Sequence, residues 1–345
     1  MPSILGTTGA QQAEVTAGNI QGALPTTVIE VLSKEIIFYA LPKFLYMQFA
    51  RRQTELNRNP GDTISIHRYD PLRKGKKLTE GVNIEPKTMS ASPVKVKVDE
   101  YGNAVRLTER LLRTSVFDQL MIAAEQLGDD YAYTTEVEFV KTLMALPSVL
   151  FANEQANRAA LLATDTLSAR TIRAAVEIQK NKLVPAFKVA NPFGGGQVEV
   201  YICFVNPHQA RTLREDPEYK EDVRPNHATR IFMGEIGMYE KVVFIETTMI
   251  PVIETGTGDI YINSENFSDP LIVDDPIAAD VAPAAFDVHT AFLFGDWTYG
   301  FAEALPVELR DDPPEDLGRK RKLGWYSIQG SALVNSDHGM RIETA

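Results

Sequence analysis

Two short segments of alternating hydrophobicity, separated by a long basic connection, constrain the fold of this chain more than any other feature. Residues 63–69 and 94–98 alternate apolar and polar side chains, as β-strands with one apolar face do. More than twenty residues separate them, far more than a tight hairpin turn contains. A two-stranded projection is marginally stable alone in water, and its connecting backbone needs hydrogen-bond partners. The sequence therefore predicts a segment that is either disordered or completed by something else.

A helical pattern of unusual length follows these strands. Apolar residues recur at helical spacing through residues 117–143, and Ser115 is a candidate N-cap with Asp118 in the first turn. About thirty residues predict a helix roughly 45 Å long. Gly128 lies inside it, where glycine costs about 1 kcal/mol relative to alanine. Two interpretations of Gly128 carry equal weight: a flex point, or close packing by a neighbouring element.

The charge of the chain is unevenly distributed. The formal net charge of −11 argues against a protein that grips nucleic acid through its phosphates. Residues 68–97 nevertheless hold eight basic and three acidic side chains, whereas residues 254–287 hold eight acids and no Lys or Arg. We call these segments the basic arm and the acidic block. The basic side chains are Arg68, Arg73, Lys74, Lys76, Lys77, Lys87, Lys95 and Lys97.

Length and composition indicate a folded protein with a large core. A chain of 345 residues with 44% apolar side chains predicts about two domains that need no disulfide or metal for stability. The single cysteine, Cys203, lies in an apolar run and is best explained as a small buried hydrophobe. Residues 1–25 are rich in Gly, Ala, Gln and Thr, which favours a mobile arm, and they lack a targeting signal. No apolar run is long enough to span a membrane.

The remaining pattern is of mixed α and β type. A capping-box pattern from Thr27 to Glu30 predicts a helix that ends at Pro42, and a second, shorter helix is expected over residues 43–52. The tail, 323–343, contains strand-like residues mixed with Gly and Asn. Further helices are expected at 168–183 and 207–214, and further strands at 198–205, 241–247, 260–262 and 289–294.

The sequence contains no motif that indicates a catalytic or ligand-binding residue. The five histidines do not stand at metal-ligand spacing with one another or with Cys203. The three glycines 194–196 lack the Lys and Ser/Thr that a phosphate-binding loop needs, and no nucleophile-elbow motif is present. Adjacent acid pairs such as Asp129-Asp130 are more often solvated surface than a catalytic pair. We therefore predict no catalytic, cofactor-binding or metal-binding residues.

Several segments, in their order along the chain, resemble the major capsid proteins of tailed bacteriophages, and most closely the family typified by short-tailed phages. Together they extend over roughly residues 28–345. The segments are Gly61-Asp62-Thr63-Ile64, Leu78-Thr79-Glu80-Gly81-Val82, Tyr101-Gly102-Asn103-Ala104-Val105-Arg106-Leu107-Thr108, Val205-Asn206-Pro207-His208, Gly234-Glu235-Ile236-Gly237, Phe244-Ile245-Glu246-Thr247, Phe294-Gly295, Tyr299-Gly300 and Gly318 to Trp325.

The resemblance implies an α+β fold with named parts. They are an N-terminal arm (1–27), N-terminal helices of the peripheral domain (28–57), an extended loop (58–106), a spine helix with the peripheral domain (107–164), an axial domain (165–298) and peripheral return strands (299–345).

The same resemblance implies a function and partners. Members form hexamers and pentamers of an icosahedral shell around double-stranded DNA, assembled in the host cytoplasm as part of the virion. A portal protein at one vertex, a scaffolding protein and a cement or decoration protein are the implied partners, with no sequence-specific DNA contacts and no membrane.

The basic arm suggests how copies would meet. We expect Arg73, Lys74, Lys76, Lys77 and Lys87 to face acids of an adjacent subunit, among them two neighbouring aspartates of the acidic block. A solvated basic loop is the alternative. Some relatives form isopeptide cross-links from an extended-loop lysine to an asparagine, and nothing specific in this sequence supports one. The acids are Asp274 and Asp275, and the conceivable cross-link partners are Lys74 to Lys77 and Asn335.

The interpretation that fits these features best is a structural shell protein without catalytic turnover. The first alternative is the shell of an enzyme-loaded nanocompartment, which neighbouring DNA-packaging genes would separate from a phage head. The second is a soluble α/β enzyme, which would elute as a small oligomer in size-exclusion chromatography.

Overall fold

The computed structural model describes residues 26–40, 43–53, 63–69, 91–115, 118–190, 196–223, 235–255, 258–262, 286–313 and 315–345, together with residues 75, 77, 80, 83, 88 and 89. Residues 1–25 of the predicted N-terminal arm (1–27) and residues 263–285 of the acidic block lie outside these ranges, whereas residues 26 and 27 belong to helix α1. No helix within them has the length and apolarity that crossing a membrane requires.

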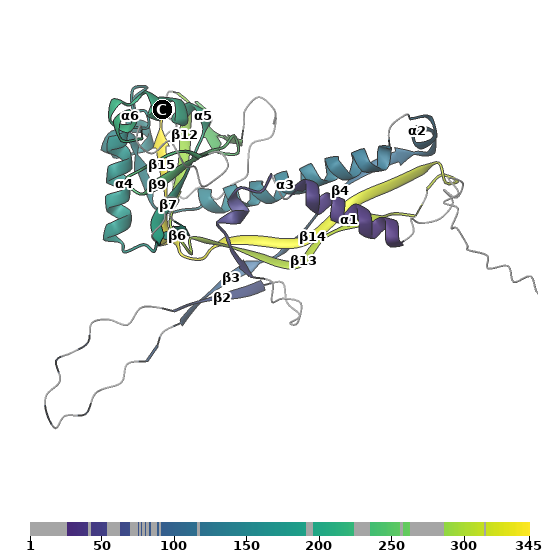
Figure 1. Ribbon diagram of the computed structural model, residues 1–345, viewed down its shortest axis with the longest axis horizontal. Coiled ribbons are helices and arrows are strands. Elements are labelled where there is room, and N and C mark those ends of the chain that lie inside the picture. Colours follow the sequence, from purple (N-terminus) through teal and green to yellow (C-terminus); the bar gives the residue numbers. More distant parts are fainter. Residues whose placement is uncertain are drawn as a thin grey trace, which may run out of the picture.

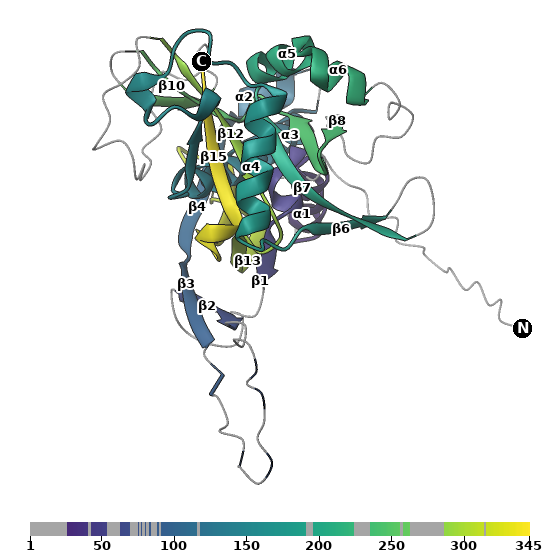
Figure 2. The same cartoon turned by 90° about the vertical axis from the view of Figure 1, so that its left-hand side faces the viewer.

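The described residues form two packed regions and a projection (Figure 1). A nine-stranded sheet with three covering helices makes one end of the molecule. From it, the long helix α3 (Gln119–Met144) and a four-stranded sheet extend side by side to the short helix α2 (Glu109–Thr114). The two-stranded sheet of β2 (Thr63–Tyr69) and β3 (Ala91–Lys97) projects away from both regions, as Figure 2 also shows.

The nine-stranded sheet is of mixed type, with strand order β11-β10-β12-β7-β9-β8. Strand β15 pairs with β12 and, in parallel, with β5, whereas β6 pairs with β7. The strands are β5 (Val149–Phe151), β6 (Phe187–Ala190), β7 (Gln197–Val205), β8 (Glu235–Tyr239), β9 (Val242–Glu246), β10 (Pro251–Ile253), β11 (Ile260–Ile262), β12 (Val288–Phe294) and β15 (Gly339–Thr344).

Both faces of this sheet are buried, which explains the continuous apolar run of β7. Tyr201, Cys203 and Val205 belong to the core under helices α4 (Ala169–Asn181), α5 (Pro207–Glu215) and α6 (Pro217–Val223). The alternate residues, Ile202 and Phe204, belong to the core shared with α1 and α3. One strand therefore connects the core of the sheet with that of the elongated region.

The elongated region consists of the four-stranded sheet, in the order β1-β13-β14-β4, with helices packed against it. Trp325 of β14 anchors the packing, since its indole Nε1–H donates to Asp130 Oδ2 at 2.7 Å and its ring packs edge-on against Tyr131 of α3. Helix α1 (Thr26–Ala40) packs on α3 and on β13. The strands are β1 (Arg51–Gln53), β4 (Asp99–Thr108), β13 (Tyr299–Asp311) and β14 (Lys320–Leu333).

The predicted helices and strands are largely confirmed. Helices α4 and α5 match the expected ranges, with Ser168 and Asn206 as N-caps. Strands β7, β9, β11 and β12 occupy the four predicted strand positions. The side chains of Thr27 and Glu30, which carry the predicted capping box, lie outside the described part of the chain.

The predicted start of the long helix is wrong by one element. Ser115 is the C-cap of the short helix α2, whereas the side chain of Asp118 accepts from the backbone N–H of Leu120 and caps α3. The chain thus makes two helices because the cap of the second interrupts the pattern. At 26 residues, α3 is about 39 Å long.

The helix expected over residues 43–52 does not form. A 3₁₀ turn at Tyr46–Gln48 and strand β1 take its place. The carboxylate of Glu136 accepts from the backbone N–H groups of Tyr46 and Met47 at 3.0 and 3.4 Å, and the Tyr299 hydroxyl donates to Tyr46 O at 2.6 Å. These tertiary contacts use backbone groups that a continuous helix would need for itself.

The sheets divide the chain differently from the ranges implied by the resemblance. Strand β4 was expected within the extended loop of residues 58–106. It follows β3 directly after Val98 and pairs with β14 along ten residues. Strand β15, expected among the peripheral return strands, pairs with β12 inside the nine-stranded sheet. Both follow from pairing partners distant in sequence, which local patterns do not reveal.

Candidate assembly surfaces

The projection of β2 and β3 is a ribbon with little core of its own. The strands pair antiparallel from Thr63 opposite Lys97 to Tyr69 opposite Ala91. Among the described side chains of these two strands, Ile66 and Val96 are the fully buried ones, at 1% and 0% exposure. Each strand also has one edge without a partner strand among the described residues. Burial is therefore confined to the half of the ribbon nearest Val98, from Val96 to Ile66.

That half, the root of the projection, packs on the four-stranded sheet. Ile66, Val96 and Val98 form a hydrophobic cluster with Ala302 of β13 and Val334 after β14. This cluster is separate from the two larger cores. It fixes where the ribbon leaves the body of the molecule.

A glycine allows the close crossing at the root. A Cβ placed on Gly330 of β14 would lie 2.0 Å from the carbonyl oxygen of Lys97, which no side chain can tolerate. Nearby, a Cβ on Gly300 would lie 2.8 Å from Ile66 Cδ1. Because the Lys97 contact is to backbone, larger residues at 330 would displace β3 rather than a flexible side chain.

Polar contacts complete the root. The Arg68 guanidinium donates to Asn335 Oδ1 at 3.0 Å, and Asn335 Nδ2 lies 2.6 Å from His338 Nε2. Burial lowers the pKa of His338 below its usual range, although the carbonyl of Asp296 opposes the shift. Asn335, named above as a conceivable cross-link partner, thus uses its side chain within its own copy.

The basic arm and the acidic block are described in part. Lys77 is exposed. Near the end of the acidic block, Asp287 accepts from the backbone N–H and the hydroxyl of Thr255, at 2.9 and 2.6 Å. These two hydrogen bonds hold the pKa of Asp287 below its usual range. The other predicted contact residues, Arg73, Lys74, Lys76, Lys87, Asp274 and Asp275, lie outside the described residues.

Gly128 lies where α1 crosses α3. A Cβ at this position would be 2.9 Å from the carbonyl oxygen of Ile36 and 3.1 Å from Tyr39 Cβ. Helix α3 is continuous through Gly128, which is buried. Close packing by a neighbour, one of the two interpretations, therefore accounts for the glycine, and the flex point stays a prediction.

A buried ion network joins the long helix to the nine-stranded sheet. Arg158 donates twice to the carboxylate of Glu343, at 2.8 and 2.7 Å, and Arg341 Nε lies 3.0 Å from the same carboxylate. Arg341 also donates to the carbonyl of Met144, the last residue of α3. The three charged side chains are at most 3% exposed. Sequence analysis missed this network, although Arg341 and Glu343 alternate within an apolar strand, which was the available signal.

A second buried carboxylate holds the N-terminal segment on α3. Burial raises the pKa of Glu136 to about 7. Hydrogen bonds from the backbone N–H groups of Tyr46, Leu45 and Met47 favour the charged carboxylate and oppose this rise in pKa. Its partners are backbone groups, so the contact positions the chain rather than a ligand.

The described residues contain no cluster of three His, Cys, Asp or Glu side chains able to hold a metal. His208 and His289 stack with ring centroids 4.3 Å apart, and burial together with His208 lowers the pKa of His289 to about 4. Burial also raises the pKa of the Cys203 thiol, so this cysteine is a packed hydrophobe as predicted. These groups serve the packing of the nine-stranded region.

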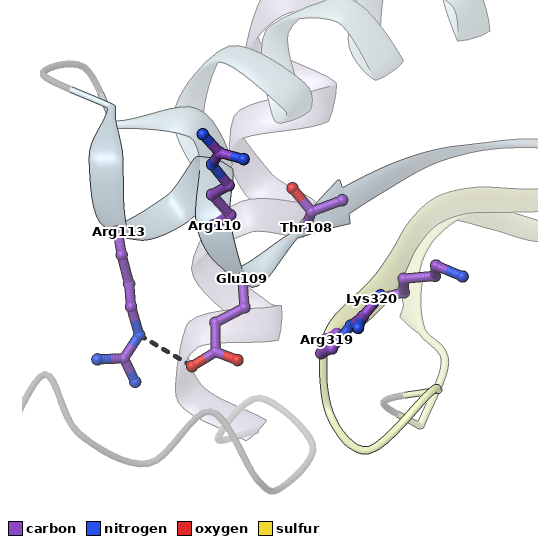
Figure 3. Close-up of a pocket in the computed structure, with 6 residues that line it drawn as sticks. All are labelled: Thr108, Glu109, Arg110, Arg113, Arg319 and Lys320. Carbon is purple, nitrogen blue, oxygen red and sulfur yellow. Dashed lines mark hydrogen bonds and ion pairs between the residues drawn. The ribbon is translucent and has the colours of Figure 1, made fainter.

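The far end of the elongated region holds an open pocket of about 540 Å³, which we call the tip pocket (Figure 3). It lies between α2 and the turn that connects β13 to β14. Its lining is mostly basic: Thr108, Glu109, Arg110, Arg113, Arg319 and Lys320.

Comparison with known proteins identifies the family. A family model described as phage capsid protein matches residues 91–334, from β3 to the end of β14, which is more than half of the chain. The chain belongs to the phage capsid protein family. No curated protein sequence matches it.

Solved capsids share the fold at low sequence identity. The capsid of Ralstonia phage GP4 is 18% identical, with a TM-score of 0.63, and the match covers 86% of this chain and 87% of that chain. The cyanophage Pam1 capsid is 15% identical, with a TM-score of 0.63 and coverage of 86% and 88%. The capsid of Helicobacter pylori bacteriophage KHP30 is 15% identical, with a TM-score of 0.64 and coverage of 86% of each chain.

The family match selects among the functions considered above. The protein is a major capsid protein, a structural subunit of the phage head, and it belongs to the virion capsid. It is a shell component and not an enzyme. The predicted tailed-phage capsid fold, with its long helix and mixed α/β region, is confirmed by the solved capsids.

Proposed function

We propose that this capsid protein forms hexamers and pentamers of an icosahedral shell, in which the β2–β3 projection of one copy lies on a neighbouring copy. The observation that supports this most strongly is the contrast within the projection. Its root is packed and hydrogen-bonded, whereas the described side chains beyond the root are exposed and both strand edges lack partners among the described residues.

The physical argument concerns what the projection lacks. A two-stranded ribbon is marginal in water, and unpaired strand edges readily bind other chains. Packing on a neighbour would bury its exposed apolar side chains, such as Tyr69 and Met89, which are 64% and 68% exposed. The fixed root directs the projection, so less conformational freedom is lost on contact.

Charge would set the register of this contact. Arg73, Lys74, Lys76, Lys77 and Lys87 carry the positive charge of the basic arm. We propose that they face an acidic surface of the adjacent subunit that includes Asp274 and Asp275. Such exposed pairs contribute mainly to orientation and weaken with salt.

The remaining expectations extend the same proposal. The phage would be of the short-tailed type, with a portal protein at one vertex, a scaffolding protein and a cement or decoration protein. We keep the divisions at residues 27, 57, 106, 164 and 298 as proposed functional regions, although the pairings of β4 and β15 cross them. An acidic subunit with a net charge of −11 suits a container whose wall does not grip the phosphates of packaged double-stranded DNA.

A charge-reversal experiment tests the role of the basic arm. Lys74, Lys76 and Lys77 are changed together to Glu in the full chain, and assembly is followed by negative-stain microscopy and sedimentation. We expect shells to be lost at physiological salt while the thermal unfolding of the subunit is unchanged. The matched control reverses three exposed lysines of the nine-stranded region, Lys180, Lys188 and Lys220.

Two outcomes would contradict the proposal in different ways. Normal shells from the triple variant would exclude a role for the basic arm. A wild-type chain that stays a compact monomer at high concentration would exclude self-assembly itself.

A further inference from the structure

The tip pocket has an excess of cations, and the turn beside it carries one of the most exposed apolar side chains among the described residues. Four of its six lining residues are cations and one is a carboxylate. Glu109 pairs with Arg113 at 2.9 Å, and Asp316 pairs with Arg319 and Lys320 at 3.2 and 3.3 Å. Among the ion pairs of the described residues, Arg110 has no carboxylate partner. The pocket therefore retains positive charge that an acidic group could neutralise.

Leu317, at the apex of the adjacent turn, is 98% exposed. Asp316, Leu317 and Gly318 have φ values of 55°, 58° and 85°, a left-handed conformation that Gly and Asp tolerate and that disfavours Leu. A leucine held in this conformation in full contact with water gains nothing within its own copy. Burying this side chain against another molecule would remove apolar surface from water, which is favourable.

Contacts where the turn joins its strands and α2 hold it in place. Arg321 and Asp311 form a buried two-point ion pair at 2.9 and 2.8 Å, and the backbone N–H of Glu109 donates to Arg319 O at 3.0 Å. The turn and the short helix α2 thus keep a fixed relation, so the pocket is preformed.

The same turn also carries two acidic side chains, which we call its acidic flank. Asp312 and Glu315 are both exposed and share one cation, Lys322, at 3.3 and 2.5 Å. The tip therefore carries a positive pocket, an exposed apolar side chain and two exposed acids. A surface that carries both complementary parts can join copies head to tail, in a ring or a continuing chain.

We propose that the tip pocket is a contact site for a second copy of the chain, which inserts its acidic flank of Asp312 and Glu315 and covers Leu317. This inference rests on the proposed function and deepens it by naming the contact. Because the tip lies at the far end of the molecule from the nine-stranded sheet, this contact is distinct from any that the sheet makes (Figure 1).

A charge swap tests the contact in the full chain. One variant carries Arg110→Glu and Arg113→Glu, another carries Asp312→Lys and Glu315→Lys, and a third carries all four changes. We expect each double variant to lower the fraction of chain in closed shells by about tenfold or more and the combined variant to restore most of it. Shells are counted by negative-stain microscopy and sedimentation, and folding is checked by thermal unfolding.

A second variant removes the apolar contact without touching the charges. Leu317→Ser is expected to lower shell formation, and Leu317→Met to preserve it. The matched control is Leu183→Ser, since Leu183 also has a positive φ, of 55°, and is 87% exposed, but follows α4 in the nine-stranded region. Leu317→Ser tests the contact even where a charge variant fails to fold.

The outcomes separate this inference from the function on which it rests. Wild-type shells together with normal shells from the Arg110/Arg113 and Leu317→Ser variants overturn the tip contact alone. Folded double variants that both fail to assemble and are not restored in combination overturn the pairing with Asp312 and Glu315. A wild-type chain that forms no oligomer contradicts the proposed function and the tip contact with it.

Discussion

The nine-stranded sheet and the β2–β3 projection differ in how far their strands are buried within one copy of the chain. In β7, Ile202, Cys203, Phe204 and Val205 are all 0% exposed, because helices cover one face and the elongated region covers the other. In the projection, burial ends at the root cluster of five side chains. The first region is stable through contacts within one copy. The second is packed only at its base, and we propose that a neighbouring copy completes it.

The largest expected effect comes from a substitution in the nine-stranded region, at the buried ion network. Glu343→Ala would leave Arg158 and Arg341 buried without their carboxylate, which should lower the free energy of unfolding by about 3–5 kcal/mol. Chemical denaturation of the subunit measures this. The control, Glu109→Ala, removes the partner of an exposed arginine and should cost less than about 1 kcal/mol. Equal midpoints for Glu343→Ala and wild type would contradict the structural importance of the network.

The next variant disturbs the packing at the root of the projection. Gly330→Ala places a Cβ against the carbonyl of Lys97, so β3 must move away from β14 at a cost of about 1–3 kcal/mol. We expect a folded subunit that no longer assembles, as judged by sedimentation. Gly75→Ala, whose Cβ would meet no atom within 4 Å, is the matched control and should assemble normally. Normal assembly of Gly330→Ala would show that the direction of the projection is unimportant.

A pH titration of wild type against Glu136→Gln sharpens the comparison, because the difference between the two chains reports on the packed region. The folded pKa of Glu136, about 7, exceeds the value of 4.5 expected for the unfolded chain. Its contribution to stability is therefore complete below pH 4.5 and is lost as pH rises through 7. Between about pH 5 and about pH 8, wild type should lose about 1–3 kcal/mol relative to Glu136→Gln. Denaturation at both pH values measures the difference, and a constant or rising one would refute the assignment.

The smallest expected effect separates the two interpretations of Gly128. If close packing explains the glycine, Gly128→Ala pushes against the backbone of Ile36 and should destabilise the subunit by about 1 kcal/mol, after the gain in helix propensity. If Gly128 is a flex point without tight packing, alanine should stabilise the helix by a similar amount. The sign of the shift in the thermal unfolding midpoint distinguishes them.

Elements with a strong local signal were predictable from the sequence. Helices α4 and α5 are capped by Ser168 and Asn206, whose side chains accept from backbone N–H groups of the first turn. Strand β7 contains a continuous apolar run, residues 200–205. The paired strands of the projection were visible because each alternates. The resemblance of scattered short segments predicted the capsid fold that the family match supports.

Features that depend on distant partners were not predictable. The turn at Tyr46 forms because Glu136 and Tyr299 bind its backbone, and neither residue is near it in sequence. At Val98 the pairing strand changes from β2 to β14. The alternation of apolar and polar residues continues through Val98, so the sequence does not show this change. The tip pocket likewise requires α2 and the β13–β14 turn, about two hundred residues apart, to meet.

Hydrogen exchange of the projection, in the free subunit and in the assembled shell, tests the central claim most directly. Amides of residues 63–69 and 91–97 would be compared with those of 201–205, which serve as an internal reference. We predict fast exchange of the projection in the dilute free subunit, slowing by about a hundredfold or more on assembly, while the reference amides stay protected in both states. Equal, strong protection of the projection in the free subunit would show that it needs no neighbour and would contradict the account.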